Sequence, residues 1–269
     1  MLKDRLVFTL LMDNGQYYLG RNFKLQKVGD LEWILDNYDI DSILHSVDEL
    51  IVLNVGREQK NTDTFAKHLE QLAQYCFMPV AAGGGIYSIS DAYKIISAGA
   101  DKIVVNSALI TDKNLVRDLV KIFGSQCIVA SIDYKEENDV IKTFIKDSTI
   151  DSGLNIYEAI DNAVGLGIGE IFLNSIAKEG TGQGLDIDLV KKVASKIAVP
   201  IVASGGIERT DQFSEALKGA DIKAVAASDL LYFMGDSLSV AREYMIANDC
   251  DVAYWGTLAE FENLQNKNG

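Results

Sequence analysis

The chain has 269 residues, with 25 basic and 39 acidic side chains, so its formal net charge is −14. An acidic surface repels the phosphates of nucleic acids, and we therefore expect no nucleic-acid partner. No stretch of about 18 apolar residues is present to cross a membrane. Charges at Lys3, Asp4 and Arg5 stand where a secretory signal would be apolar, so we expect a cytoplasmic protein without membrane contact.

Eight short apolar runs rich in β-branched residues recur along the chain and predict strands that are buried on both faces. They span residues 5–11, 49–55, 78–82, 102–106, 127–132, 170–176, 199–204 and 223–228. Amphipathic segments of helical length lie between them, at 61–75, 112–123, 154–167 and 186–197. Asp186 stands where it would cap the last of these helices. The alternation indicates either a (βα)8 barrel or an open doubly wound α/β sheet.

An internal repeat separates these two folds, because the second half of the chain resembles the first at an offset of about 121 residues. VAAGGGI at 80–86 returns as VASGGI at 202–207, and the only two prolines, Pro79 and Pro200, have the same separation. Two fused half-barrels explain this spacing, whereas a Rossmann-type sheet does not. We therefore predict one (βα)8 TIM barrel over residues 1–269. Its homologous half-barrels are predicted at about 1–123 and 124–249, with a polar C-terminal tail at 250–269.

The first expected connection, at 16–30, is long for a barrel loop and contains Gly20 and Gly29. Long loops at a barrel mouth are commonly lids, so we expect this segment to close over the mouth. Tyr17 and Tyr18 within it would either contact a ligand or cover apolar surface.

Two glycine-rich turns stand where the ligand of such a barrel lies, at the C-terminal ends of strands. Each is followed by polar residues at the end of the next strand: Asn106 and Ser107 in the first half, Ser228 in the second. Bare backbone N–H groups and hydroxyls suit an anion. The pattern predicts two phosphate sites on opposite sides of the mouth, and hence a small molecule phosphorylated at both ends. The alternative is that the glycines only form tight turns.

One carboxylate is expected at the same mouth. The fifth apolar run leads to Asp133, and a carboxylate buried there without a task costs free energy. The repeat puts Leu11 at the matching place in the first half, so a second acid is absent there. Leucine performs no proton chemistry.

Metal sites are not expected. Cys76, Cys127 and Cys250 lie far apart, and His45 and His68 each stand alone in a helix-like stretch. Zinc sites need close pairs of such ligands, so we interpret the cysteines as reduced thiols and expect neither a metal nor a cofactor.

Several segments, in this order, resemble the cyclase subunit family of imidazole glycerol phosphate synthase: RLVFTLLMDNG, GRNF, AAGGGI, GADKIVVNSAL, FGSQCIVASID, GIGEIFLNSIAKEGTGQG, ASGGI and AASDLLYF. The resemblance covers nearly the whole chain. It implies a barrel that forms a heterodimer with a glutaminase subunit docked at its N-terminal face. Ammonia from the glutaminase would pass along the barrel axis and, at the mouth, split and cyclise a bisphosphorylated ribosyl intermediate.

The resemblance assigns two phosphate sites at the mouth. The first falls on Gly85, Asn106 and Ser107. The second falls on Gly180, Gly206 and Ser228, and Glu179 stands there where the family has an aspartate.

The reacting groups of the family are only partly matched. Asp133 corresponds to one of two catalytic aspartates, but the other falls on Leu11. A loop lysine falls on Leu19, and an aspartate of the second strand falls on Asn54. Loss of one member of a positioned acid–base pair costs about 10²- to 10⁴-fold in rate, so we expect a weak or inactive cyclase.

The opposite end of the barrel matches the family more fully. A ring of four charged residues closes the ammonia entrance in the family, and these positions are Arg5, Glu49, Lys102 and Glu170. Asp101 and Gln126 match positions of the glutaminase interface. The resemblance therefore implies that docking and ammonia passage are retained.

A second branch of the family, from gene clusters for bacterial surface polysaccharides, also has leucine at the position of Leu11 and an Asn-Ser pair like Asn174–Ser175. With a glutaminase and a sugar amidotransferase, that branch supplies ammonia to turn an acetamido group into an acetamidino group. We expect this role. One alternative is an active lyase and cyclase of histidine biosynthesis in which other groups replace Leu11. Another is a phosphosugar isomerase, which would have no use for the gate charges.

Overall fold

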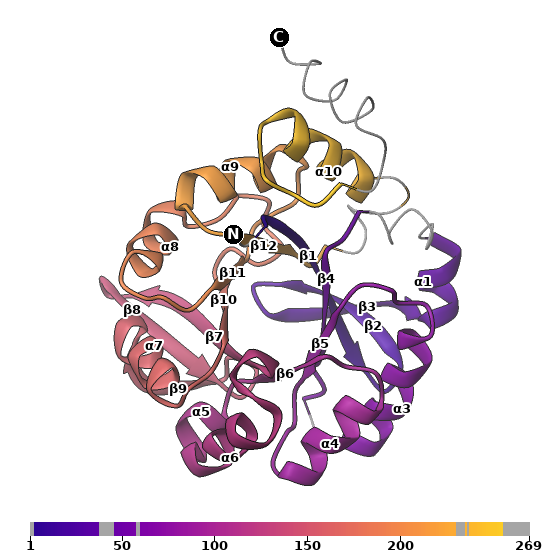
Figure 1. The fold of residues 1–269 in the computed structure, drawn as a ribbon, viewed down its shortest axis with the longest axis vertical. Helices are drawn as coiled ribbons and strands as arrows, with labels where there is room; N and C mark the ends of the chain where they lie inside the picture. Colours follow the sequence, from indigo (N-terminus) through magenta and orange to yellow (C-terminus); the bar gives the residue numbers. More distant parts are fainter. Residues whose placement is uncertain (1–2, 38–45, 58–59, 230–234, 236, 255–269) are drawn as a thin grey trace.

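Eight parallel strands close into a barrel (Figure 1). The computed structural model describes residues 3–37, 46–57, 60–229, 235 and 237–254. In spatial order the strands are β1 (Arg5–Asp13), β4 (Glu49–Asn54), β5 (Val80–Gly83), β6 (Lys102–Val105), β7 (Ile128–Glu137), β10 (Glu170–Ser175), β11 (Ile201–Ser204) and β12 (Ala224–Ala227). Parallel pairing of β7 with β10 and of β12 with β1 completes the circle. The predicted (βα)8 barrel is confirmed, and each apolar run supplies one of its strands.

Helices surround this barrel and alternate with its strands (Figure 1). They are α1 (Leu31–Asn37), α3 (Thr62–Ala73), α4 (Ile89–Ser97), α5 (Ala108–Thr111), α6 (Lys113–Phe123), α7 (Ile156–Gly165), α8 (Ile187–Ala194), α9 (Asp211–Ala220) and α10 (Ser237–Ala247). Asn155 caps α7 through a capping box with Glu158. Asp186 precedes α8 as predicted, but its side chain makes no capping hydrogen bond. Its carboxylate instead accepts a hydrogen bond from Tyr134 and pairs with Lys178.

A β-hairpin extends from the mouth in each half of the barrel. β1 continues into β2 (Gln16–Arg21) and β3 (Lys24–Asp30), and β7 continues into β8 (Val140–Ile145) and β9 (Ile150–Asn155). Residues at positive φ form the first turn of each, Asn14–Gly15 and Asn138–Asp139. The segment expected as a lid loop is therefore a hairpin whose strands extend the ladder of β1. Tyr17 is buried in the hydrophobic core, so it covers apolar surface.

Apolar side chains fill two separate layers. The larger one lies between the barrel and the helices. The inner layer consists of Val7, Ile51, Ala81, Val104, Val129, Phe172, Val202, Ala224 and Ala226. Successive strand residues point to opposite faces, so strands buried on both faces produce the continuous apolar runs in the sequence. Within the described part of the chain, no helix is long and apolar enough to span a bilayer.

Candidate functional site

A closed ring of ion pairs lies at the N-terminal end of the barrel. Arg5 contacts Glu49 at 2.6 Å and also Glu170, while Lys102 contacts the same carboxylates at 2.7 and 2.8 Å. The four residues belong to the first positions of β1, β4, β6 and β10, which explains why they meet across the barrel axis. The sequence-predicted ring residues are thus in direct contact.

The carboxylates of this ring are buried, with 3 % of the Glu49 side chain and 7 % of the Glu170 side chain exposed. Burial acts to raise the pKa of Glu170, but the charges of Arg5 and Lys102 outweigh it and hold this pKa below its ordinary value. Each carboxylate bridges two cations, so the ring is neutral as a whole. No ion can cross the ring along the axis unless at least one of these pairs opens.

Asp101 and Gln126 are exposed near the starts of barrel strands, on the same side of the barrel as the ring. The carboxylate of Asp101 accepts a hydrogen bond from the Val80 N–H at 2.8 Å, which fixes it at the start of β5. Gln126 lies in the short 3-10 helix η1 (Ser125–Cys127) before β7. Both predicted interface residues are therefore available to a partner on this face.

A cavity of about 510 Å³ opens at the other end of the barrel. Its wall contains most of the predicted site residues, namely Leu11, Gly85, Asn106, Ser107, Asp133, Glu179 and Ser228. The hairpins contribute to it, since Gly20, Phe23 and Lys146 also line it. Gly180 and Gly206 line a separate hollow of about 10 Å³ behind Glu179 and Ser228. Of the residues predicted at the mouth, Gly180 and Gly206 thus line only the small hollow, and Glu179 and Ser228 line both spaces.

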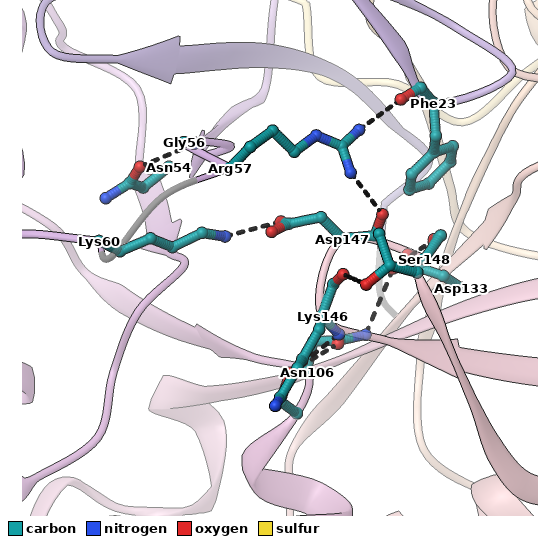
Figure 2. Close-up of polar contacts among 12 residues, drawn as sticks. Phe23, Asn54, Gly56, Arg57, Lys60, Asn106, Asp133, Lys146, Asp147 and Ser148 are labelled. Atoms are coloured by element: carbon teal, nitrogen blue, oxygen red, sulfur yellow. Dashed lines mark hydrogen bonds and ion pairs between the residues drawn. The ribbon is translucent and has the colours of Figure 1, made fainter.

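Asp133 is buried in the wall of the cavity, near the tip of the β8–β9 hairpin (Figure 2). Ser148 donates to its Oδ2 at 3.3 Å and Asn106 donates at 3.4 Å. Burial raises the pKa of Asp133 to about 7, and the Ser148 hydrogen bond only partly offsets this rise. Near neutral pH the carboxyl group can therefore take up or release a proton.

The part of the mouth that the internal repeat relates to Asp133 is apolar. Leu11 lines the cavity together with Leu53, Phe23 and Leu25. Asn54 lines it too, and its side-chain oxygen accepts the Gly56 N–H at 3.2 Å. Leu19 pairs with Gln26 within the hairpin and packs against the core. None of these side chains is an acid that could act as the partner of Asp133 in the first half of the barrel.

The first predicted phosphate site carries basic side chains that the sequence reasoning missed. Lys60 forms an ion pair with Asp147 at 2.6 Å, and Arg57 donates to the backbone carbonyls of Asp147 and Phe23 (Figure 2). Lys60 also packs against Gly85, since a Cβ at Gly85 would lie 2.6 Å from the Lys60 Cβ. Arg57 and Lys60 lie in the connection after β4, without a motif that would have marked them.

The hairpin tip reaches into the same site. The Lys146 N–H donates to the Ser107 hydroxyl at 3.1 Å, and Asn106 donates to the Ser131 carbonyl at 3.0 Å. Lys146, Asp147 and Ser148 all have positive φ, a conformation that costs free energy in residues with side chains. The contacts to Ser107, Lys60 and Asp133 hold this tip in place.

Two residues predicted at the second phosphate site, Glu179 and Ser228, contact each other. The Ser228 hydroxyl donates to the Glu179 carboxyl group, and both residues are buried. Burial raises the pKa of Glu179 to about 7, and Asp229 and Glu208 add to the rise. Near neutral pH the Glu179 carboxyl group can therefore also take up or release a proton.

Comparison with known proteins identifies the family. The model described as "Histidine biosynthesis protein" matches residues 26–236. A relative from Parasynechococcus marenigrum (strain WH8102), provisionally named imidazole glycerol phosphate synthase subunit hisF2, is 37% identical over 243 residues, which is 90% of each chain. The imidazole glycerol phosphate synthase subunit HisF of Clostridium botulinum (strain 657 / Type Ba4) is 34% identical over 248 residues, 91% of this chain and 96% of its own. The HisF subunit of Hyphomonas neptunium (strain ATCC 15444) is 34% identical over 243 residues, 90% and 95% of the two chains. The chain therefore belongs to the HisF family of imidazole glycerol phosphate synthase subunits.

Proposed function

We propose that this HisF-like barrel docks a glutaminase at its N-terminal face and conducts the ammonia formed there to the mouth. The observation that carries the proposal is the closed ring of Arg5, Glu49, Lys102 and Glu170 across the barrel axis. A purely structural barrel gains little from burying four charges, because hydrophobic residues of similar volume are commonly as stabilising as a buried ion-pair network.

The interior beyond the ring suits a small neutral molecule. Above the ring lies the inner apolar layer, in which Ala81, Ala224 and Ala226 are small. Ammonia crosses such a layer at little cost, whereas ammonium would lose its hydration. Next come polar side chains that line the floor of the cavity, Thr9, Ser131 and Ser204. This order, an apolar layer followed by hydroxyl groups, supports the passage of ammonia from the ring to the mouth.

We further propose that the acceptor is a sugar of a surface polysaccharide, whose acetamido group becomes an acetamidino group on a third protein, a sugar amidotransferase. Two features support this finer role: Leu11 in place of an acid, and Asn174–Ser175 at the end of β10. An apolar residue opposite Asp133 leaves the mouth without the matched acid–base pair that cyclisation is expected to need.

The alternative is an active lyase and cyclase that makes imidazole glycerol phosphate. One observation favours it: Asp133 and Glu179 line the same cavity, and burial raises the pKa of each to about 7. Glu179 would then take the part that Leu11 has lost.

Two assays distinguish these functions. In the first, the purified chain and Leu11→Asp receive an ammonium salt and the bisphosphorylated ribosyl intermediate, and imidazole glycerol phosphate is measured. Product from the unaltered chain establishes the alternative. In the second, a purified glutaminase subunit is assayed for glutamine hydrolysis with and without the chain. We expect no product in the first assay and a rise in glutamine hydrolysis in the second. Unchanged hydrolysis would refute the docking role.

A further inference from the structure

We propose that Arg57 holds the two mouth hairpins together, so that the β2–β3 and β8–β9 hairpins open and close as one unit. Its guanidinium donates to the Asp147 carbonyl at 2.9 Å and to the Phe23 carbonyl, one in each hairpin tip (Figure 2). We call this pair of contacts the Arg57 bridge. Neither ammonia nor a glutaminase takes part in the bridge, which therefore stands apart from the proposed function. A ligand that exchanges at the mouth meets the two hairpins as a single lid.

The two hairpins extend over the mouth from opposite sides of the barrel. They continue β1 and β7, which lie four positions apart in the closed ring of eight strands. Phe23 and Leu25 of the first hairpin line the mouth cavity, and so do Lys146 and Asp147 of the second. Arg57 follows β4, the neighbour of β1, and lines the same cavity. The shape of this cavity therefore depends on the position of both tips.

Each tip offers Arg57 a carbonyl group of a turn. Phe23 lies between β2 and β3, Asp147 lies between β8 and β9, and both residues have positive φ. Carbonyl groups of a turn lie outside the hydrogen-bonded ladder of the flanking strands and need another donor. A guanidinium presents its N–H donors in a rigid plane, so one arginine can serve two such carbonyls. Its charge makes each hydrogen bond stronger than a neutral one.

The Arg57 bridge is the only hydrogen-bonded link between the two hairpins in the part of the chain that the structure describes. Lys60 forms an ion pair with Asp147, whereas Arg57 forms no ion pair with any described residue. The guanidinium is therefore held by the two tips and not by a carboxylate. Just before it, the Gly56 N–H donates to Asn54 Oδ1 at 3.2 Å, which fixes the turn that carries Arg57.

Backbone strain at the second tip indicates that the tip moves once it is released. Lys146, Asp147 and Ser148 follow one another at φ values of 52°, 54° and 61°. Residues with side chains adopt this left-handed conformation at a cost in free energy, and three in succession are unusual. Such strain persists only where surrounding contacts hold it. Arg57 and Lys60 supply two of these contacts, so their loss lets the tip relax away from the cavity.

Amide hydrogen exchange of the purified full chain, followed by mass spectrometry, tests the bridge. One reporter peptide covers the first hairpin, 16–30, where the Asn22 N–H donates to a backbone carbonyl of the β10–α8 connection at 2.8 Å. The other covers the second tip, 140–150, where the Lys146 N–H donates to the Ser107 hydroxyl at 3.1 Å. Both hydrogen bonds hold a tip to the barrel, so exchange in these peptides reports how often each hairpin opens.

We expect Arg57→Met to speed exchange in both peptides by about 10-fold, on the scale of one lost charge-assisted hydrogen bond. Exchange in a peptide over the buried strand β11 should stay unchanged, which verifies that the barrel remains folded. Faster exchange in only one hairpin, or in neither, overturns the proposal.

Lys60→Met is the matched control. Lys60 also contacts Asp147, at 2.6 Å, but forms no hydrogen bond or ion pair with a described residue of the first hairpin. Its loss should speed exchange over 140–150 and leave 16–30 unchanged. Equal acceleration of both peptides would show that the hairpins are coupled without Arg57, against the proposal.

Asn22→Ala tests the coupling from the other side. It removes the hydrogen bond that the Asn22 side chain donates to the Ala177 carbonyl at 2.6 Å, and so loosens the first hairpin. We expect this variant to exchange faster over 140–150 as well, and to have no further effect there when it is combined with Arg57→Met. Acceleration confined to 16–30 would mean that the two hairpins open independently. Since no glutaminase or acceptor is present, this result is separate from any failure of ammonia transfer.

Discussion

Replacement of Glu49 by glutamine is expected to lower the free energy of unfolding by about 3 kcal/mol. The Glu49 side chain is 3 % exposed and contacts Arg5 at 2.6 Å and Lys102 at 2.7 Å. Without its charge, these two cations share only Glu170, and the ring changes from neutral to one excess positive charge. Breaking a buried ion pair by removing one partner costs about 3–5 kcal/mol. An amide still makes hydrogen bonds, so the lower end of this range applies.

Urea unfolding of the purified chain, followed by circular dichroism, measures this loss. The double variant Glu49→Gln/Lys102→Met restores neutrality through the remaining pair of Arg5 and Glu170. We therefore expect it to lose less than the sum of the single variants, by at least about 1 kcal/mol. The control is Lys94→Met, which removes an exposed ion pair of the same 2.6 Å length with Asp63. An effect of Glu49→Gln no larger than this control, or additive single effects, would refute the reasoning.

Three further predictions concern the mouth and its supports. Burial raises the pKa of Asp133 to about 7. Above about pH 4 the unfolded state releases this proton, whereas the folded state retains it up to about pH 7. The contribution of Asp133 to stability therefore falls as pH rises from about 4 to 7. Asp133→Asn should therefore leave stability unchanged near pH 3 and raise it at pH 8 by on the order of 4 kcal/mol, as measured by urea unfolding at both pH values. Gly180→Ala should lower Tm by several degrees more than Gly153→Ala, because both positions have positive φ but only Gly180 faces a backbone oxygen within 4 Å; equal shifts would contradict this. Asn155→Ala should cost about 1 kcal/mol through loss of the α7 cap, and Asn155→Asp should retain most of it.

The strands were predictable because a barrel strand is buried on both faces and therefore reads as an apolar run. The hairpins were not, since most residues of β2, β3, β8 and β9 are half-buried or exposed and give no apolar run. Their place is fixed by pairing, of β2 with β1 and of β8 with β7. The contact between Glu179 and Ser228 joins residues 49 positions apart, and no local pattern encodes it. Arg57 and Lys60 could not be predicted for the same reason, because their contacts at the mouth depend on the position of Asp147 in the tip of the β8–β9 hairpin.

The two ends of the barrel differ in the residues that their proposed functions require. The ring is a network in which every charge has two partners, so it requires all four residues. The mouth has two carboxyl groups with a pKa of about 7, but Glu179 already accepts a hydrogen bond from Ser228. Cyclisation needs one group to give a proton and another to take one, and Glu179 is the lining carboxyl group whose pKa, like that of Asp133, lies near 7. Ammonia delivery makes no such demand. Glu179→Gln therefore separates the two functions: it would remove whatever cyclisation the chain performs and leave the activation of a docked glutaminase intact.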